Sequence, residues 1–582
     1  MAIRVNFAGA SLTKPGSYSN LTVGQAGVAI PAVGTVAIIG EADGGIPFSE
    51  EAGLSKVSFG PDEKSAVKEK FVDGPLVDAY NLVIQASKDR QITGGAQEVL
   101  LLKTNRSTRA SLNVMKDSMT VYATLTDKVG GAKGNNIYYA CENNGTTATI
   151  TVTSADGVGK PKTIGNTPVM KITGPGMSSL TITDTAFTVS GASAFSIPFS
   201  EAPTIAALVE KINTKTGFGA TAADKMSSKL VDRLDRVSNV SLSSSEFTVK
   251  QDAWEFRDLF SVEFPKIQVS QSVKSGLPPT ATKKNFEGGA KGGTLSSDVQ
   301  NCLDELLKRR VNFVVPLFSR DSMLDASEGA TDPSSSYSID AIHAATTSHV
   351  MLASTTKGRK ERQAWVGYKG TFDDSAAKAG AIGNHRVSMC IQDVQIGSTI
   401  HQPHMLAVAA AGMHAAAAIG LSTTFKSVNI LGFAHQDFDP ETQAEKAIEA
   451  NLTFVETSPS GAPRFVLDNN TYGADADAWI YNRPSVIYAG DFASYLIRLS
   501  TEQFVGQRNS DVSPESIKNL LVTVFDSLRS LGVIVADALT GGKGYKDLSV
   551  KINGSIVSVD VTLALVENYE FILNDIKVQR AG

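Results

Sequence analysis

The clearest spacing for chemistry in this chain belongs to three histidines. His401 and His404 enclose the dipeptide Gln402–Pro403, and His414 follows along the same segment. Two histidines with this spacing at a helix entrance could bind a metal ion or act as a general base. No acidic residue lies at helical spacing nearby to complete a site, so we favour a packing and capping role for them.

Other segments that could carry out chemistry lack the patterns that would support it. The motifs GxSxG, GxxxxGK[ST] and HExxH are all absent, and the glycine turns that contain lysine, 157–161 and 288–293, lack the flanks of a phosphate loop. Residues 358–363 favour a solvated turn over an anion site, and residues 438–451 favour a capped helix over an acid–base pair. We therefore expect no enzymatic activity, no metal site and no cofactor.

Composition indicates a multidomain globular protein. The chain has 582 residues, of which 42% are hydrophobic and 19% are charged, and single cores rarely grow beyond about 250–300 residues. The net charge of −5 gives no reason to expect direct nucleic-acid binding. The three cysteines, Cys141, Cys302 and Cys390, are too far apart to form a zinc motif or to indicate a disulfide framework.

Neither the start of the chain nor its longest apolar stretch predicts membrane insertion. The first twenty residues lack the apolar centre of a secretory signal. The longest apolar stretch, 405–421, consists largely of alanine and is too short and too weakly apolar to span a bilayer. We expect synthesis in a cytoplasm, and we expect the small side chains to allow close packing of a helix on a sheet.

Alternating strands and helices predict a three-layer α/β core built from two separate parts of the chain. In the first part, a buried strand within 33–45 precedes a helix over 74–87 and a strand over 97–104. The second part continues this alternation with helices over 296–310, 338–354 and 404–420 and with strands over 311–318, 362–370, 386–394 and 464–472.

The segment between these two parts has a different composition. Its short strands are rich in threonine and serine and are separated by turn residues, which is typical of an antiparallel β domain with one helix over 204–217. The glycine-rich cluster 287–293 predicts a linker or hinge. The fold class is thus α/β, a discontinuous core with an inserted β-rich domain and extended strand arms. The expected bounds are 1–20 for the N-terminal arm, 21–104 and 286–555 for the core, 105–285 for the insertion and 556–582 for the C-terminal arm.

The end of the chain contains its best helix and its best strand. Ser513, Pro514 and Gly532 bound a helix whose apolar residues, from Ile517 to Leu531, form one stripe. Residues 558–578 alternate apolar and polar side chains as a strand does. A chain end frays unless something holds it, so this strand needs a partner.

Several motifs resemble contractile tail sheath proteins of the phage type, whose relatives occur in tailocins and contractile injection systems. The motifs are "KPGSYS" (14–19), "VGTVAIIGEADGG" (33–45), "GNNIYYA" (134–140), "FVGQRNSDVSPESIKNLLVTVFDSLRSLGVI" (504–534) and "INGSIVSVDVTLALVENYEFILNDIKV" (552–578). Their order along the chain carries the resemblance, which covers roughly 20–104 and 290–582. The β-rich insertion matches only loosely.

The resemblance implies a structural subunit that stacks in hexameric rings around an inner tail tube. The rings would contract to drive the tube through the host envelope for genome ejection, without nucleotide, and the β insertion would face outward. The implied partners are other copies of the chain, the inner tail tube protein, and the baseplate and tail terminator proteins. The implied location is the virion tail, assembled in the host bacterial cytoplasm.

The resemblance also implies that arms of neighbouring subunits complete one another's sheets by strand addition. The N-terminal arm carries only basic charges and the C-terminal arm is mainly acidic, so opposite charge could select the partner. Pairing of each end within its own core is the alternative. The helix over 513–531 would meet the tube through Lys518 and Arg529. The expected arm contacts are Ile3, Val5, Phe7, Val559, Val561, Leu563, Leu565 and Phe571.

Two other functions stay open at this point. A non-contractile coat or surface-layer protein would also exchange strands but would form one lattice only. A hydrolase or carbohydrate-binding protein with an accessory β domain would be monomeric and would place His401 and His404 in a polar cleft.

Overall fold

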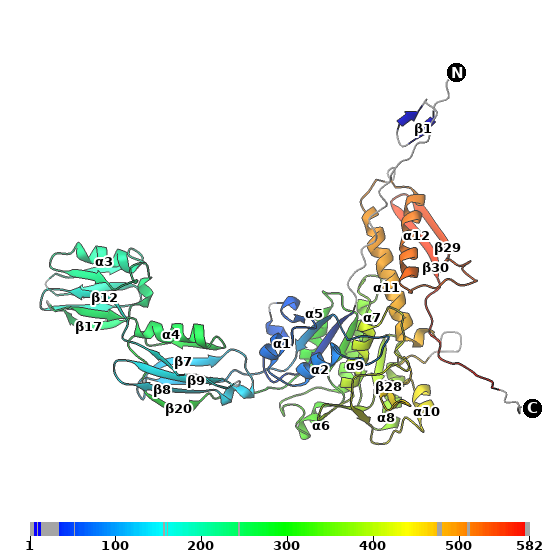
Figure 1. Cartoon of the computed structure of the whole chain (residues 1–582), viewed down its shortest axis with the longest axis horizontal. Coiled ribbons are helices and arrows are strands. Elements are labelled where there is room, and N and C mark those ends of the chain that lie inside the picture. Colours follow the sequence, from blue (N-terminus) through cyan, green and yellow to red (C-terminus); the bar gives the residue numbers. More distant parts are fainter. Residues whose placement is uncertain are drawn as a thin grey trace, which may run out of the picture. The chain divides into compact units, whose positions relative to one another are not determined.

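The structure is a computed structural model that divides into two compact units, each described here by itself (Figure 1). The first unit comprises residues 1–33, 417–424 and 474–582, and the second comprises residues 34–416 and 425–473. For residues 5–7, 10–12, 154, 157 and 158 only the backbone is described. The described residues are 5–7, 10–12, 34–51, 53–154, 157–159, 161–191, 193–242, 245–473, 480–508 and 512–576.

A six-stranded sheet forms the centre of the second unit, in the order β23-β22-β21-β3-β5-β4. The first five strands are parallel and β4 is antiparallel. Nearly every residue of the parallel strands is buried, as a sheet covered on both faces requires. The strands are β3 (Thr35–Gly40), β4 (Ser58–Phe59), β5 (Glu98–Lys103), β21 (Phe313–Pro316), β22 (Gln363–Gly367) and β23 (Val387–Cys390).

Helices cover this sheet as the strand–helix alternation predicted. α5 (Ser296–Leu306) and α7 (Ile339–Ala353) pack on alternate strand residues such as Ala37 and Ile39. α2 (Pro75–Val83) and α9 (His404–Ala416) contact each other and β3. The shorter helices of the unit are α1 (Lys64–Phe71), α6 (Ser322–Ser327), α8 (Phe372–Ile382) and α10 (Ala444–Glu449).

The alanine-rich helix α9 is a packing element, as its small side chains indicated. All its residues from His404 to Ala415 are buried. A Cβ on Gly412 would lie 2.7 Å from both Ala86 Cβ and Val83 O, so only glycine allows α9 to approach the α2 segment this closely. Among the described residues, no helix combines the length and apolar character that crossing a membrane requires.

Two further predictions for this unit are wrong in extent. The expected strand over 464–472 is reduced to β28 (Pro463–Phe465), which pairs with β27 (Val455–Thr457), because the asparagines and threonine that follow are buried in side-chain hydrogen bonds. The expected helix over 438–451 forms only at Ala444–Glu449. A small sheet of β24 (Asp393–Ile396), β25 (Thr399–His401) and β26 (Gly432–Ala434) completes this region.

The β-rich segment contains two separate hydrophobic cores, and the residues of the inner lobe are inserted in the sequence between two parts of the outer lobe. The outer lobe packs Tyr122, Tyr139, Phe256 and Phe260 between two sheets and a helix that the sequence analysis missed, α4 (Asp252–Glu263). Its strands are β6 (Ser111–Met115), β7 (Val121–Asp127), β8 (Tyr138–Asn143), β9 (Ala148–Ser154), β10 (Gly157–Val158), β11 (Lys162–Ile164), β19 (Ile267–Gln271) and β20 (Ala281–Asn285).

The inner lobe has its own core around Leu180, Phe187 and Leu208. Two antiparallel sheets form it, in the orders β16-β12-β18 and β15-β14-β13-β17, with helix α3 (Ile205–Asn213) where a helix was predicted. Its strands are β12 (Pro168–Thr173), β13 (Ser178–Ile182), β14 (Ala186–Ser190), β15 (Phe195–Pro198), β16 (Gly219–Ala222), β17 (Val237–Leu242) and β18 (Phe247–Lys250).

The largest described elements of the first unit are two helices and a hairpin. α11 (Pro484–Thr501) packs on α12 (Pro514–Ser530), and α12 covers one face of β29 (Tyr545–Asn553) and β30 (Ile556–Leu563). The predicted start of α12 is confirmed, since Ser513 Oγ accepts a hydrogen bond from Ser516 N at 3.1 Å. At the N-terminal end, β1 (Val5–Phe7) pairs with β2 (Ala10–Leu12).

Candidate assembly site

The hairpin β29–β30 is a sheet with two open edges. Its strands pair from Tyr545 with Leu563 to Asn553 with Ile556, and no third strand joins either one in the described part of the chain. A two-stranded sheet is marginal by itself, and this one is supported by α12, where the Phe525 and Tyr545 rings lie 4.7 Å apart. Unpaired strand edges present backbone donors and acceptors that another strand can use.

Four of the predicted arm residues contact their own unit. Val559, Val561, Leu563 and Leu565 are half-buried against the apolar cluster of α11 and α12. Residues 556–563 therefore pair within their own unit, which was the alternative to pairing with a neighbour. The strand, predicted over 558–578, ends at Leu563. The two-residue turn Gly554–Ser555, with glycine at its first position, is a hairpin signal that could have predicted this pairing and was missed.

The exposure of side chains in the segment beyond the hairpin changes at Phe571. Between Val566 and Glu570 every second side chain is half-buried, and Glu567 and Tyr569 point to solvent. Phe571 is 82% exposed and Leu573 is 93% exposed, and Ile572 and Ile576 are similarly uncovered. Exposed apolar side chains in a row indicate a surface that a partner covers.

The N-terminal arm residues can be placed only in part. Ile3 lies outside the described residues. Val5 and Phe7 belong to β1, where they pair with Leu12 and Ala10 of the same chain. The backbone there forms a short hairpin where the sequence analysis expected an extended segment.

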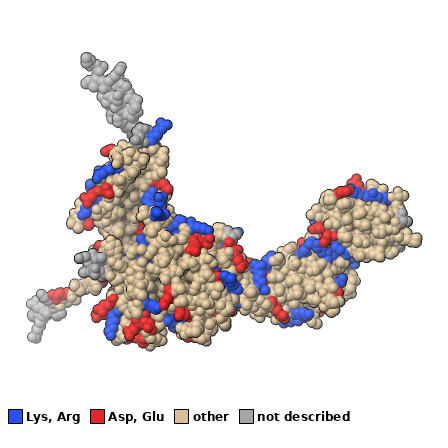
Figure 2. Space-filling view, turned by 180° about the vertical axis from the view of Figure 1, so that it is seen from behind, with Lys and Arg blue, Asp and Glu red and all other residues tan. Residues whose placement is uncertain are grey.

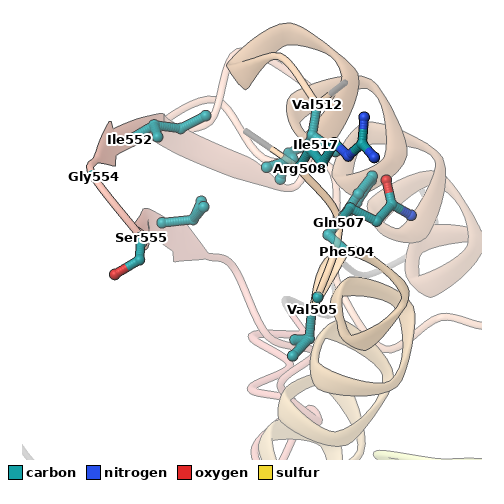
Figure 3. Close-up of a pocket in the computed structure, with 11 residues that line it drawn as sticks. Phe504, Val505, Gln507, Arg508, Val512, Ile517, Ile552, Gly554 and Ser555 are labelled. Carbon is teal, nitrogen blue, oxygen red and sulfur yellow. The ribbon is translucent and has the colours of Figure 1, made fainter. Parts of the chain in front are cut away.

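A cavity of about 530 Å³ lies at the turn of the β29–β30 hairpin (Figure 3). On one side it is bounded by the hairpin residues Ile552 and Val557, and on the other by the segment between α11 and α12. Figure 3 shows Val505, Gln507 and Arg508 on that segment, across the cavity from Ser555. Most of its lining is apolar and Arg508 supplies one positive charge, so the cavity suits an apolar segment that carries an acid.

Comparisons with known proteins agree with this architecture. No family model matches the chain. It is 21% identical over 382 residues to a tail sheath protein of Bacillus phage SP01, an alignment that spans 64% of this chain and 60% of that protein. The sheath tail protein of Desulfitobacterium hafniense has a TM-score of 0.55 at 14% identity, covering 95% of this chain and 100% of its own.

A second solved structure gives the same result. The sheath tail protein of Listeria innocua has a TM-score of 0.51 at 14% identity, with 92% of this chain and 93% of its own covered. The chain has the fold of sheath tail proteins. The resemblance that the terminal motifs suggested is confirmed.

The two residues predicted to face the tube lie on the outer side of α12 in this sheath-type fold. Lys518 is exposed, and Arg529 donates a hydrogen bond to Asp526 Oδ1 at 2.9 Å, one helical turn away. The apolar stripe of α12 is turned inward, with Ile517, Leu521 and Val524 buried. On the face drawn in Figure 2, basic and acidic side chains are interspersed.

His404 and His414 are buried packing residues. His404 Nδ1 lies 2.9 Å from Ser319 Oγ, and burial lowers the pKa of His404 to about 3, so it stays neutral. His401 lies on β25, whereas His414 is buried 3.0 Å from Asp468 and stacks on Trp365. The packing role is confirmed for His404 and His414. The described residues contain no group of three or more His, Cys, Asp or Glu side chains placed to hold a metal ion.

Proposed function

We propose that the chain is a structural subunit of a contractile tail sheath. It polymerises by strand exchange into stacked hexameric rings around an inner tail tube, and it contracts to drive the tube through a host envelope. The support is a combination of sequence similarity to a phage tail sheath protein and a fold shared with two sheath tail proteins. The aligned region spans 60% of the phage protein, so contraction and the partners below are part of the proposal.

One observation carries the proposal beyond the fold. The first unit offers two features that strand addition would use, the open edges of β29–β30 and the uncovered apolar segment 571–576. A second copy offers the occupant, because a chain of identical subunits can donate one segment and accept another. We assign the cavity beside Arg508, whose lining is mostly apolar, as the acceptor for this apolar segment.

The binding free energy expected for one arm explains why several arms must act together in a ring. Burying four large apolar side chains contributes about 6–12 kcal/mol at about 1.5–3 kcal/mol each. Ordering six residues costs about 6–12 kcal/mol, and each backbone hydrogen bond adds a net of about 0.5–1.5 kcal/mol. One arm alone therefore binds weakly. Subunits that donate and accept arms simultaneously hold together by multivalency, while each link can yield as the lattice contracts.

The remaining partners follow from the same proposal. The outer face of α12 with Lys518 and Arg529 meets the inner tube, the two β lobes face outward, and baseplate and terminator proteins bound the stack. The energy for contraction is stored in the extended lattice, with no cofactor and no catalytic step. The location is the virion tail.

Electron microscopy of the purified protein tests the proposal. We expect rings or tubes at high concentration and two lattice states that differ in length and width. A single rigid lattice under all conditions would indicate a non-contractile coat protein. A monomer at every concentration and in every buffer would contradict the proposal.

A further inference from the structure

The C-terminal segment is held to its own unit at a point beyond the hairpin. Asn568 Nδ2 donates a hydrogen bond to Gly420 O at 2.9 Å, and Ser422 N donates to Asn568 Oδ1 at 3.3 Å. A Cβ on Gly420 would lie 2.2 Å from Val566 Cγ1, so the close approach of the segment requires glycine there. The loop 417–424 thus receives the segment through specific contacts.

A second contact lies two residues further on. Arg483 donates to both carboxylate oxygens of Glu570, with Nη2 2.8 Å from Oε2, and the two side chains are only 14% and 17% exposed. Arg483 is also the N-cap residue of α11, where the helix dipole places partial positive charge. The carboxylate of Glu570 is held by a bidentate, charge-assisted pair of hydrogen bonds from the Arg483 guanidinium.

The side chains of the segment become exposed after Glu570. Val566, Asn568 and Glu570 share the inward face of an extended segment, and from Phe571 onward the apolar side chains are uncovered. We infer that Asn568 and Glu570, with Gly420, Ser422 and Arg483, form an exit latch. The exit latch fixes the point at which the C-terminal segment leaves its own subunit. The part available to a neighbour then begins at Phe571, and this inference rests on the proposed strand donation.

The exit latch limits which neighbour the segment can reach. The six described residues beyond it, 571–576, span at most about 22 Å when fully extended, at about 3.3–3.6 Å per residue. Release of residues 567–570 would add about 14 Å, enough to allow a shifted register or another acceptor. A fixed exit point therefore makes Arg483 and Glu570 positioning residues for assembly, with no contact to the acceptor required.

Spin labels on the dissociated full-length subunit test the latch directly. The three native cysteines are buried, so single labels at Tyr569→Cys and at Leu573→Cys report on the two sides of Glu570. We expect a restricted label at 569 and a mobile label at 573. Arg483→Gln or Glu570→Gln should make the label at 569 as mobile as that at 573, whereas Glu567→Gln, which changes an exposed acid of the same segment, should not. An unchanged label at 569 in both latch variants would overturn the inference.

Assembly supplies the second readout. Each latch variant should raise the critical concentration for polymerisation about tenfold, which corresponds to about 1.4 kcal/mol. The melting temperature of the dissociated subunit should change little, and the exchanged pair Arg483→Glu with Glu570→Arg should restore assembly. Lost assembly without rescue, or unchanged assembly in the latch variants, would contradict a positioning role. If a chain lacking residues 571–582 still assembles normally, the strand donation fails, and the labels separately decide whether the latch exists.

Discussion

The polypeptide leaves its compact cores in two contrasting ways, at the junction of the β lobes and at the C-terminal segment. At the junction, Lys103 Nζ is buried and lies within hydrogen-bond distance of Gly45 O, Asn105 O and Ser107 Oγ, at 3.1, 2.7 and 2.6 Å. Asn105 Nδ2 binds both Ala42 O and Lys291 O, each at 2.8 Å. The C-terminal segment instead leaves its apolar side chains exposed from Phe571 to Ile576.

The junction and the C-terminal segment differ in the kind of group that each buries away from water. The junction buries polar groups that must all find partners, and such a fully bonded network fixes one geometry. The C-terminal segment leaves apolar groups unburied, and those are satisfied only by another surface. The glycine-rich cluster 287–293, predicted as a linker or hinge, is thus fixed by hydrogen bonds. The last part of the predicted strand, 571–576, is exposed instead. We expect rigidity at the lobes and exchange at the terminus.

The largest expected effect is a pH dependence at the junction. Burial lowers the pKa of Lys103 from about 10.5 to about 7. Between these values the unfolded chain binds the proton and the folded chain does not, so the free energy of unfolding should rise by up to about 1.4 kcal/mol per pH unit from pH 7 to about pH 10. Lys103→Met should flatten this rise in denaturant titrations, while the exposed Lys284→Met should retain it. Equal slopes in wild type and Lys103→Met would show that folding does not lower the pKa of Lys103.

A matched pair of prolines compares the hairpin with the released segment. Val559→Pro should cost about 3 kcal/mol of stability in the dissociated subunit, because it disturbs the pairing with Val550 and the packing on α12. Ile572→Pro should leave stability unchanged and weaken assembly. Calorimetry and light scattering on both variants separate the two effects. A stable Val559→Pro subunit would mean that β30 is not part of its own core.

Removal of one junction side chain should have a moderate effect. Asn105→Ala deletes bonds to Ala42 and Lys291 and leaves buried backbone groups without partners, at a cost of about 2 kcal/mol. Urea denaturation should show this loss, and the exposed Asn574→Ala should show none. A neutral Asn105→Ala would remove the distinction between a locked junction and a released terminus.

The smallest expected effect is on α12. Lys518→Ala and Arg529→Ala should change stability by less than about 0.5 kcal/mol, since exposed charges and an i,i+3 pair contribute little. Both should reduce co-sedimentation with inner tubes, and Lys551→Ala on the hairpin should serve as the control. Full tube binding by both α12 variants would exclude this face from the contact.

The spacing of apolar residues and the helix-capping residues were sufficient to predict the elements whose partners lie in the same unit. β3, β5 and α2 follow from apolar runs and spacing, and α12 follows from Ser513, Pro514 and its stripe. Helix α4 was missed because its polar and apolar residues are poorly segregated along "DAWEFRDLFSVE". The two β lobes were predicted as a single domain, because the sequence of a short strand does not indicate which hydrophobic core the strand joins.

The candidate site could be predicted only in part, for a physical reason. Alternation over 558–578 indicates that side chains take turns between two surroundings, but it does not say whether the partner is the same chain, another copy or solvent. The pairing of β30 was decided by the turn after Asn553, and the contacts of Asn568 and Glu570 depend on a distant loop and helix start.

Removal of residues 571–582 tests strand donation most directly. The full-length chain and the shortened chain should be compared by electron microscopy for assembly and by calorimetry for melting. We expect rings or tubes from the full-length chain only, and the same melting temperature for both dissociated subunits. Tubes of unchanged geometry from the shortened chain, or its failure to fold, would contradict donation of this segment between subunits.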